Sequence, residues 1–200
     1  NRDEGVHHGD AERPVQRVLL TWMATADALR QAGEAGCDLV ICHESAFFPY
    51  DAIVRSDVPA DWPEWPTNRQ RLELLNRYDL TLLRAHGSLD DICIFDDFAA
   101  LLGLGAPVLE EQGLVKLYGI QPTTLAALAD QVKAATGLAT VRVSVPQGWD
   151  QTVQRIGLPW GGLGLFVNVS YQQRVIALGC DALIAGEADS YGFRFSDELG

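Results

Sequence analysis

The sequence predicts an α/β fold, a three-layer open sheet of βαβ units with a small inserted βαβ subdomain. Two observations lead to this prediction. Short apolar runs typical of strands alternate with segments of helical periodicity, and the chain returns from helix to strand within a few residues. Three of the apolar runs, at 38–41, 80–85 and 182–185, end in short clusters that contain acidic or histidine side chains.

The main sheet is predicted from five strands with helices between them. The strands are expected at 15–21, 38–42, 80–85, 154–158 and 182–185, and the helices at 25–34, 68–78, 91–104 and 166–178. Thr25 or Asp27 is suited to cap the first helix, and Gly36 follows its end. A parallel sheet is therefore expected, because each helix connects one strand to the next.

Residues 114–146 are predicted to form the inserted subdomain. The expected elements are a strand at 114–120, a helix at 123–136 and an alternating strand at 139–145. Residues 1–113 and 147–200 then form one discontinuous domain that carries the site. Because the chain begins with Asn1 and ends just after a strand and a loop, we expect an excerpt trimmed at both ends.

Composition narrows the classes of partner. The net charge of −12 argues against a nucleic-acid binder, which usually carries a basic face. No apolar stretch approaches the ~20 residues of a membrane helix, and no secretory signal is visible. The four cysteines form no Cys-x-x-Cys pair. We therefore expect a cytoplasmic protein with reduced thiols.

Three polar clusters point to a metal site. They are Cys42-His43-Glu44, His86-Gly87-Ser88-Leu89-Asp90-Asp91 and Gly186-Glu187-Ala188-Asp189. In open α/β sheets, ligands gather at the carboxyl ends of the strands. Three such ends are therefore expected to line one edge of the sheet and to hold a metal.

Each cluster also has a simpler interpretation. His43 and Glu44 suit zinc, iron or manganese if the chain turns after the strand, but taken alone they are better read as a hydrogen-bonded histidine and a solvated acid. Asp90 can ligate a metal, and His86 can ligate it or orient another ligand. The simpler interpretation is that Asp90 or Asp91 caps the helix that follows. Glu187 and Asp189 are equally well interpreted as exposed acidic residues of a loop or as residues of the site.

Two further motifs leave alternatives open. The glycine-rich turn at 157–164 lacks the residues of a phosphate-binding loop, so tight strand-to-helix packing explains it better. His7 and His8 suit a site-facing loop or a flexible end equally well. The sequence contains no nucleophile elbow, so catalysis through a covalent intermediate is not favoured.

Four segments resemble those of the NGG-interacting-factor-three-like family of dinuclear-metal, toroidal hexamers, some of which are called GTP cyclohydrolase I type 2. The segments run, in order, Gly5-Val-His-His-Gly-Asp10, Ala35-Gly-Cys-Asp-Leu-Val-Ile-Cys-His-Glu44, Arg84-Ala-His-Gly-Ser-Leu-Asp90 and Gly179-Cys-Asp-Ala-Leu-Ile-Ala-Gly-Glu187. The resemblance covers almost the whole chain.

The resemblance implies a metal centre of two divalent transition-metal ions (Zn, Fe or Mn). It makes His43 and Asp90 ligands, with His86 close by, and Asp90 is expected to be shared between the ions. Glu44 stands where the family usually has a second histidine, and it completes the expected ligand set. The family's remaining ligands, from a His-x-x-x-Glu segment, do not occur in this chain. A homo-hexamer is likewise implied.

The expected function is that of a metal-dependent hydrolase acting on a small nucleotide-like molecule, in the manner of a GTP cyclohydrolase. Asp90 and Glu44 are the expected catalytic residues, because paired ions and carboxylates activate water. The alternative is a non-enzymatic metal-binding regulatory protein that binds a protein partner through the Trp-rich loop at 61–66. A third interpretation is that the protein is a member of this fold family whose metal site has been lost. It follows from the presence of Glu44 where the family usually has a histidine.

Overall fold

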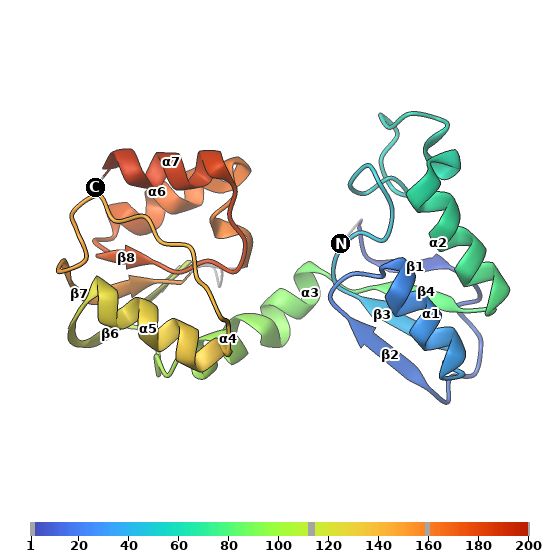
Figure 1. Ribbon diagram of the computed structural model, residues 1–200, viewed down its shortest axis with the longest axis horizontal. Coiled ribbons are helices and arrows are strands. Elements are labelled where there is room, and N and C mark those ends of the chain that lie inside the picture. Colours follow the sequence, from blue (N-terminus) through green and yellow to red (C-terminus); the bar gives the residue numbers. More distant parts are fainter. Residues whose placement is uncertain (1–2, 112–114, 159–160, 200) are drawn as a thin grey trace. The chain divides into compact units, whose positions relative to one another are not determined.

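The computed structural model describes residues 3–111, 115–158 and 161–199. The chain forms two compact units, the first ending at Leu89 and the second beginning at Asp90. Each unit contains a four-stranded mixed sheet with helices (Figure 1), which confirms the predicted α/β class. Among the described residues, the helices are too short or too polar to cross a bilayer.

The first unit is built on a sheet of strand order β1-β4-β3-β2. Its elements are β1 (Gly5–His8), β2 (Val18–Thr21), α1 (Ala26–Glu34), β3 (Leu39–Cys42), η1 (Trp62–Glu64), α2 (Pro66–Arg77), β4 (Thr81–Arg84) and α3 (Gly87–Leu89). Strands β2, β3 and β4 are parallel, whereas β1 is antiparallel to β4. Strand β1 includes His7 and His8, so these histidines lie on a sheet edge rather than in a loop or a flexible end.

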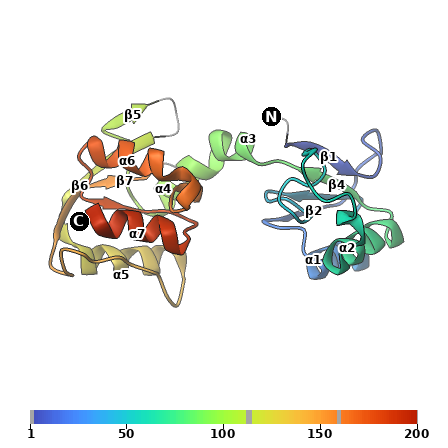
Figure 2. The same cartoon turned by 90° about the horizontal axis from the view of Figure 1, so that it is seen from above.

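Helices α1 and α2 lie side by side on one face of this sheet (Figure 2). Their apolar stripes, with Leu29 and Leu75 fully buried, pack on Val40 and Leu82 of the central strands. Thr25 caps α1 by accepting the backbone N–H of Ala28, as the sequence predicted. This packing fixes the strands β3 and β4, whose carboxyl ends carry the first two polar clusters.

The long loop at 49–66 is held to the body of the first unit. Asn68 is fully buried, and its amide donates to the carbonyl oxygens of Phe48 at 2.5 Å and Trp62 at 2.6 Å. The Trp62 ring packs 5.4 Å from that of Phe47. Trp62 thus has the packing role that is the simpler interpretation of this loop, while partner binding by residues 61–66 stays a prediction.

The second unit has a sheet of order β5-β6-β7-β8. Its elements are η2 (Asp90–Ile94), α4 (Phe95–Leu101), β5 (Leu109–Glu111), β6 (Val115–Thr124), α5 (Leu125–Thr136), β7 (Thr152–Gly157), η3 (Gly161–Leu163), η4 (Phe166–Asn168), α6 (Val169–Ala177), β8 (Ala182–Leu183) and α7 (Ser190–Leu199). Helix α5 packs on one face of the sheet and α6 on the other, and α7 packs against α6 (Figure 1). The helix α7 was not predicted from the sequence.

The division of the chain differs from the predicted one. The sequence predicted one domain of residues 1–113 and 147–200 with an insert at 114–146, but β7 pairs with β6 and β8 in the second sheet. The boundary therefore falls after Leu89. The pattern of apolar residues identifies a strand, but the strand with which it pairs depends on residues far away in the sequence. Leu114 of the predicted insert lies outside the described residues.

The predicted strand at 139–145 is irregular in the structure. Its alternating Val143 and Val145 pack against the core of the second unit, but the segment joins no sheet. Alternation of apolar and polar residues indicates that one face of a segment is buried. It does not indicate which strand, if any, the segment pairs with.

The glycine-rich turn is explained by close packing, as expected. Pro159 and Trp160 of this turn lie outside the described residues. A Cβ on Gly164 would stand 2.4 Å from the carbonyl oxygen of Glu187, and one on Gly192 would stand 1.9 Å from that of Gly164. Glycine is therefore required where these two backbones meet.

Candidate metal centre

Parallel pairing brings the first two polar clusters to the same edge of the first sheet. Strands β3 and β4 are neighbours with Cys42 opposite Arg84. The backbone N–H of Ala85 donates to the carbonyl oxygen of Cys42 at 2.9 Å, so the two chains leave the sheet together. His43 and His86 follow directly, as the sequence predicted from the strand ends.

His43, Glu44 and His86 form a cluster of potential metal ligands. One ligand atom from each residue lies within 4.8 Å of the other two. The Nδ1 atom of His43 lies 3.4 Å from Oε1 of Glu44, and the imidazole centroids of His43 and His86 are 4.8 Å apart at 80°. His43 is 5% exposed, so its imidazole is shielded from bulk water.

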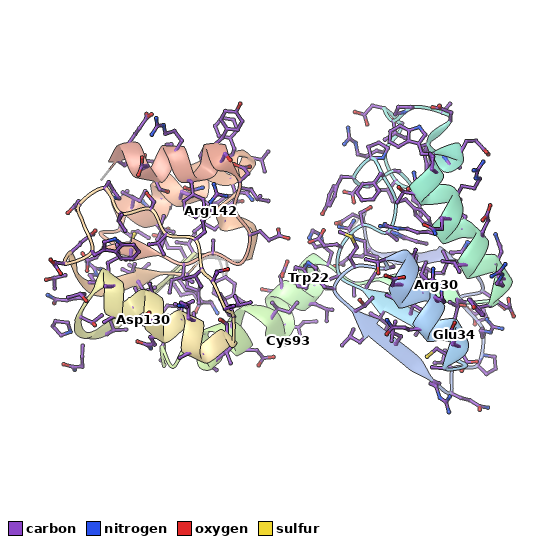
Figure 3. The ribbon with its side chains drawn as sticks, viewed as in Figure 1. Trp22, Arg30, Glu34, Cys93, Asp130 and Arg142 are labelled. Atoms are coloured by element: carbon purple, nitrogen blue, oxygen red, sulfur yellow. The ribbon has the colours of Figure 1, made fainter. Side chains whose placement is uncertain are left out.

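Adjacent residues reach one cluster because the chain turns after β3. The backbone N–H groups of His43 and Glu44 both donate to the carbonyl oxygen of Trp22, at 3.0 Å and 2.8 Å. This pairing replaces the alternating geometry of a strand, in which neighbouring side chains point to opposite faces. The Trp22 indole, labelled in Figure 3, stacks on the His43 imidazole at 4.0 Å and 14°.

The N-terminal segment holds His86 from the other side. The Nδ1 atom of His86 lies 2.8 Å from Oδ2 of Asp3. The carboxylate of Glu4 accepts the backbone N–H of His86 at 2.7 Å and both the backbone N–H and the hydroxyl of Ser88, at 2.8 Å and 2.9 Å. Glu4 thus satisfies the donors at the start of α3.

A buried guanidinium lies behind the cluster. The side chain of Arg84 is fully buried and donates to the carboxylate of Asp51, to the hydroxyl of Tyr50 at 2.7 Å and to the carbonyl oxygen of His43 at 3.1 Å. Its Nη1 atom also lies 3.5 Å from Oδ2 of Asp3. Asp3 therefore connects Arg84 with His86.

These contacts favour ionised carboxylates. The hydrogen bond with His43 lowers the pKa of Glu44 more than burial raises it. Burial also raises the pKa of Asp3, but the hydrogen bond with His86 and the charge of Arg84 outweigh it, so the pKa of Asp3 lies below its usual value. At neutral pH the cluster therefore contains negative charge beside two imidazoles.

The third polar cluster does not belong to this sheet edge. Strand β8, which precedes Glu187 and Asp189, pairs with β7 in the second unit. Asp189 accepts the backbone N–H groups of Gly192 at 2.7 Å and Phe166 at 2.9 Å, so it has a structural role. The expectation that three strand ends line one edge is thus corrected to two.

Asp90 occupies a different position from the one its sequence context suggested. Helical turns begin at Gly87, and Asp90 starts the π-helical turn η2 at the beginning of the second unit. Because the helical run already begins at Gly87 and continues through η2 into α4, Asp90 and Asp91 lie inside it, and the capping interpretation is not supported. The role of Asp90 as a metal ligand and catalytic residue stays a prediction.

Six residues of this environment were missed by the sequence analysis. They are Asp3, Glu4, Trp22, Tyr50, Asp51 and Arg84. One signal was visible: an arginine ends the apolar run 80–84, where a buried charge needs partners. The partners themselves carry no local signal, since Asp3 and His86 are 83 residues apart.

Comparison with known proteins identifies relatives of this chain. The family described as Duf34/NIF3 (NGG1p interacting factor 3) matches residues 2–198. The chain is 26% identical over 193 residues to a protein of Streptococcus pneumoniae named GTP cyclohydrolase 1 type 2 homolog, covering 92% of this chain and 68% of that one.

Solved structures show the same fold. The Bacillus cereus protein related to NIF3 matches with a TM-score of 0.76 and 13% identity over 98% of this chain and 79% of that chain. The protein ybgI, of unknown function, matches with a TM-score of 0.74 and 24% identity over 96% and 73% of the two chains. With the family match extending over nearly all residues, the chain belongs to the Duf34/NIF3 family.

Proposed function

We propose that His43, Glu44 and His86 hold a divalent transition-metal ion and that the protein is a metal-dependent hydrolase acting on a nucleotide-like substrate. The observation that carries this proposal is the convergence of the three ligand atoms within 4.8 Å. The convergence comes from two segments of the chain that only the parallel pairing of β3 and β4 brings together.

The donor set fits such an ion. Two imidazoles and one carboxylate suit zinc, iron and manganese, and zinc held by two histidines and a glutamate is typical of catalytic sites that keep a position open. The lowered pKa of Glu44 leaves a carboxylate able to ligate at neutral pH. A second ion, shared through Asp90, and a homo-hexamer stay predictions from the family resemblance.

The surrounding residues have distinct tasks in this proposal. Asp3 engages Nδ1 of His86, which leaves Nε2 for the ion. Trp22 fixes the plane of the His43 ring by stacking on it, and 48% of Trp22 is exposed beside the cluster. This indole offers a flat apolar surface for a planar ring such as a purine.

Hydrolysis is the reaction that this site suits best. A divalent ion held by these residues would supply Lewis-acid activation of water at neutral pH. A carboxylate oxygen of Glu44 that does not contact the ion would accept the proton of the attacking water. The name of the Streptococcus pneumoniae relative supports a purine nucleotide as substrate. The chain's own contribution is a shielded His43, an ionised Glu44 and a stacking surface at Trp22.

The first experiment measures metal content and turnover together. Protein purified without chelator or histidine tag is expected to contain at least one transition-metal ion per chain by elemental mass spectrometry. Hydrolysis of GTP, monitored by liquid chromatography, is expected to stop when a chelator removes the metal and to return when the metal is added back. A metal content near zero would contradict the metal site, whereas bound metal without turnover on GTP and related nucleotides would leave a binding protein.

Asp3 is expected to orient His86. Replacing Asp3 with leucine removes the acceptor for Nδ1, so we expect a 10- to 100-fold loss of Zn²⁺ affinity. Asp3→Asn, whose amide oxygen still accepts, is expected to lose less. Calorimetry with a competing chelator measures the affinities, and ¹⁵N NMR of His86 in the metal-free protein reports its tautomer.

The matched control is Asp10→Asn in the same N-terminal segment. Among the described residues, the Asp10 carboxylate accepts a local bond alone, from the backbone N–H of Glu12, so this change should leave Zn²⁺ affinity and the His86 tautomer unaltered. Unchanged affinity in Asp3→Leu would show that Asp3 does not position the ligand.

A further inference from the structure

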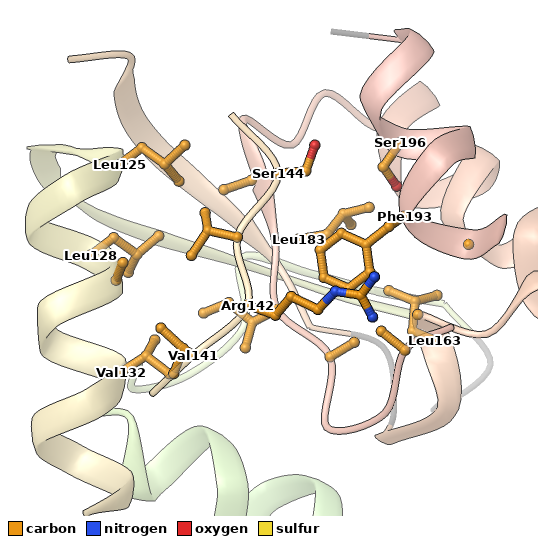
Figure 4. Close-up of a pocket in the computed structure, with 18 of the residues that line it drawn as sticks. Leu125, Leu128, Val132, Val141, Arg142, Ser144, Leu163, Leu183, Phe193 and Ser196 are labelled. Carbon is orange, nitrogen blue, oxygen red and sulfur yellow. The ribbon is translucent and has the colours of Figure 1, made fainter. Parts of the chain in front are cut away.

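The second unit contains a cavity that the proposed metal centre does not use (Figure 4). Its volume is about 590 Å³, within the ~300–1,000 Å³ range of small-molecule sites. Helix α5, the irregular segment 138–146, strand β8 and helix α7 contribute its walls. All of these elements belong to the second unit.

The interior of the cavity is apolar. Leu125, Leu128 and Val132 line it from one face of α5, and Leu183 of β8 lies across the space from them (Figure 4). Val141 of the irregular segment also lines it. Aliphatic walls of this kind favour a ligand with a hydrocarbon body, because burial of apolar surface drives its transfer from water. A wholly polar molecule would lose its hydration there without compensation.

One cation faces this apolar space. The guanidinium of Arg142 lies over the Phe193 ring, 4.5 Å from the ring centroid, and both residues line the cavity (Figure 4). In the described part of the chain, no carboxylate forms an ion pair with Arg142 within 4.0 Å. The guanidinium therefore keeps its donors for a planar anion, which it can bind through two hydrogen bonds.

The acidic groups near the cavity are engaged elsewhere. Asp181 accepts two backbone N–H groups of β7, each at 2.8 Å. Asp197 accepts the hydroxyl of Ser144 at 2.7 Å and pairs with Arg194 at 3.2 Å. Asp189 accepts two backbone N–H groups at 2.7 Å and 2.9 Å. The backbone N–H groups of Gly192 and Phe166 lower the pKa of Asp189, and the charge of Arg142 adds to this effect. These carboxylates are thus engaged by other donors, and none of them forms an ion pair with Arg142 within 4.0 Å.

From this combination we infer that the cavity binds an amphipathic monocarboxylate. The hydrocarbon part packs among Leu128, Val132 and Leu183, and the carboxylate meets Arg142 beside Phe193. A neutral hydrocarbon would gain no ionic contact with Arg142, and a cationic amphiphile would be repelled by it. The inference is independent of the metal centre and of its proposed activity.

The test uses decanoate as the probe and isothermal titration calorimetry as the measurement. Saturable binding at one site per chain is expected, with decyltrimethylammonium binding at least tenfold more weakly. Arg142→Gln, at an exposed position that should tolerate the change, is expected to weaken decanoate binding about tenfold, since a charge-assisted bidentate contact is lost. Val132→Trp, which fills the apolar space, is expected to abolish it.

The control is Arg194→Gln on α7. Arg194 is exposed and pairs with Asp197 and Glu198, so its removal changes the net charge equally without altering the cavity. Its decanoate affinity should stay within twofold of the wild type. No saturable binding of decanoate, or an equal loss in Arg194→Gln and Arg142→Gln, would overturn the inference.

Discussion

Replacing His86 with alanine is expected to lower the affinity of the protein for Zn²⁺ about a hundredfold or more. His86 supplies one of three clustered ligand atoms, and removal of a ligand costs at least as much as the 10- to 100-fold loss typical of its supporting groups. Calorimetry with a competing chelator measures the change. His8→Ala, a histidine of β1 outside the cluster, is the matched control and should bind as the wild type does.

Variants at Glu44 separate the ligand role from simple burial. Glu44→His restores the residue that the family resemblance places there and is expected to keep the metal, whereas Glu44→Leu is expected to lose it. If His86→Ala and Glu44→Leu both retain wild-type affinity, the three residues are not the metal site. Circular dichroism of each variant confirms that the fold is intact.

Replacing Arg84 with methionine is expected to lower the free energy of unfolding by about 3–5 kcal/mol. The guanidinium is fully buried and pairs with Asp51 and Asp3, so its loss leaves two largely buried carboxylates without a counter-charge. Urea denaturation measures the change, and hydrogen exchange of the β3 and β4 amides assigns it to the first unit. Arg30→Met on α1 (Figure 3), which removes only an exposed pair with Asp27, should change stability by about 0.5 kcal/mol or less.

A double variant tests the cause of this loss. If unpaired charge is responsible, Arg84→Met with Asp51→Asn should recover part of the stability, because one of the two buried carboxylates is then neutral. A double variant as unstable as the sum of both changes would attribute the effect to lost packing instead. Stability of Arg84→Met within about 1 kcal/mol of the wild type would contradict the buried role of this ion pair.

The sequence was sufficient for features that depend on neighbouring residues. Helical periodicity and the Thr25 cap located α1, and the apolar runs located β3 and β4. Since parallel strands end at the same edge, the convergence of His43 with His86 also followed from the sequence. The family resemblance, carried by short segments in order, needed no structure.

Sheet membership required the tertiary structure. The runs that became β7 and β8 look like the runs that became β3 and β4, yet β7 pairs with β6 and β8 pairs with β7 in a second sheet. The alternating segment 139–145 packs on a core without joining a ladder. A strand's pattern reports which face is buried, and its hydrogen-bonding partner is chosen by residues far away in the chain.

The environment of the proposed metal centre was decided in the same way. Asp3 reaches His86 across 83 residues, and Asp51 reaches Arg84 across 33. The sequence determined which groups can ligate, because the chemistry of an imidazole or a carboxylate belongs to the residue itself. Only the tertiary structure decided which of these groups meet, which charge is paired and which ring nitrogen is engaged, because contacts between distant segments exist only after the chain has folded.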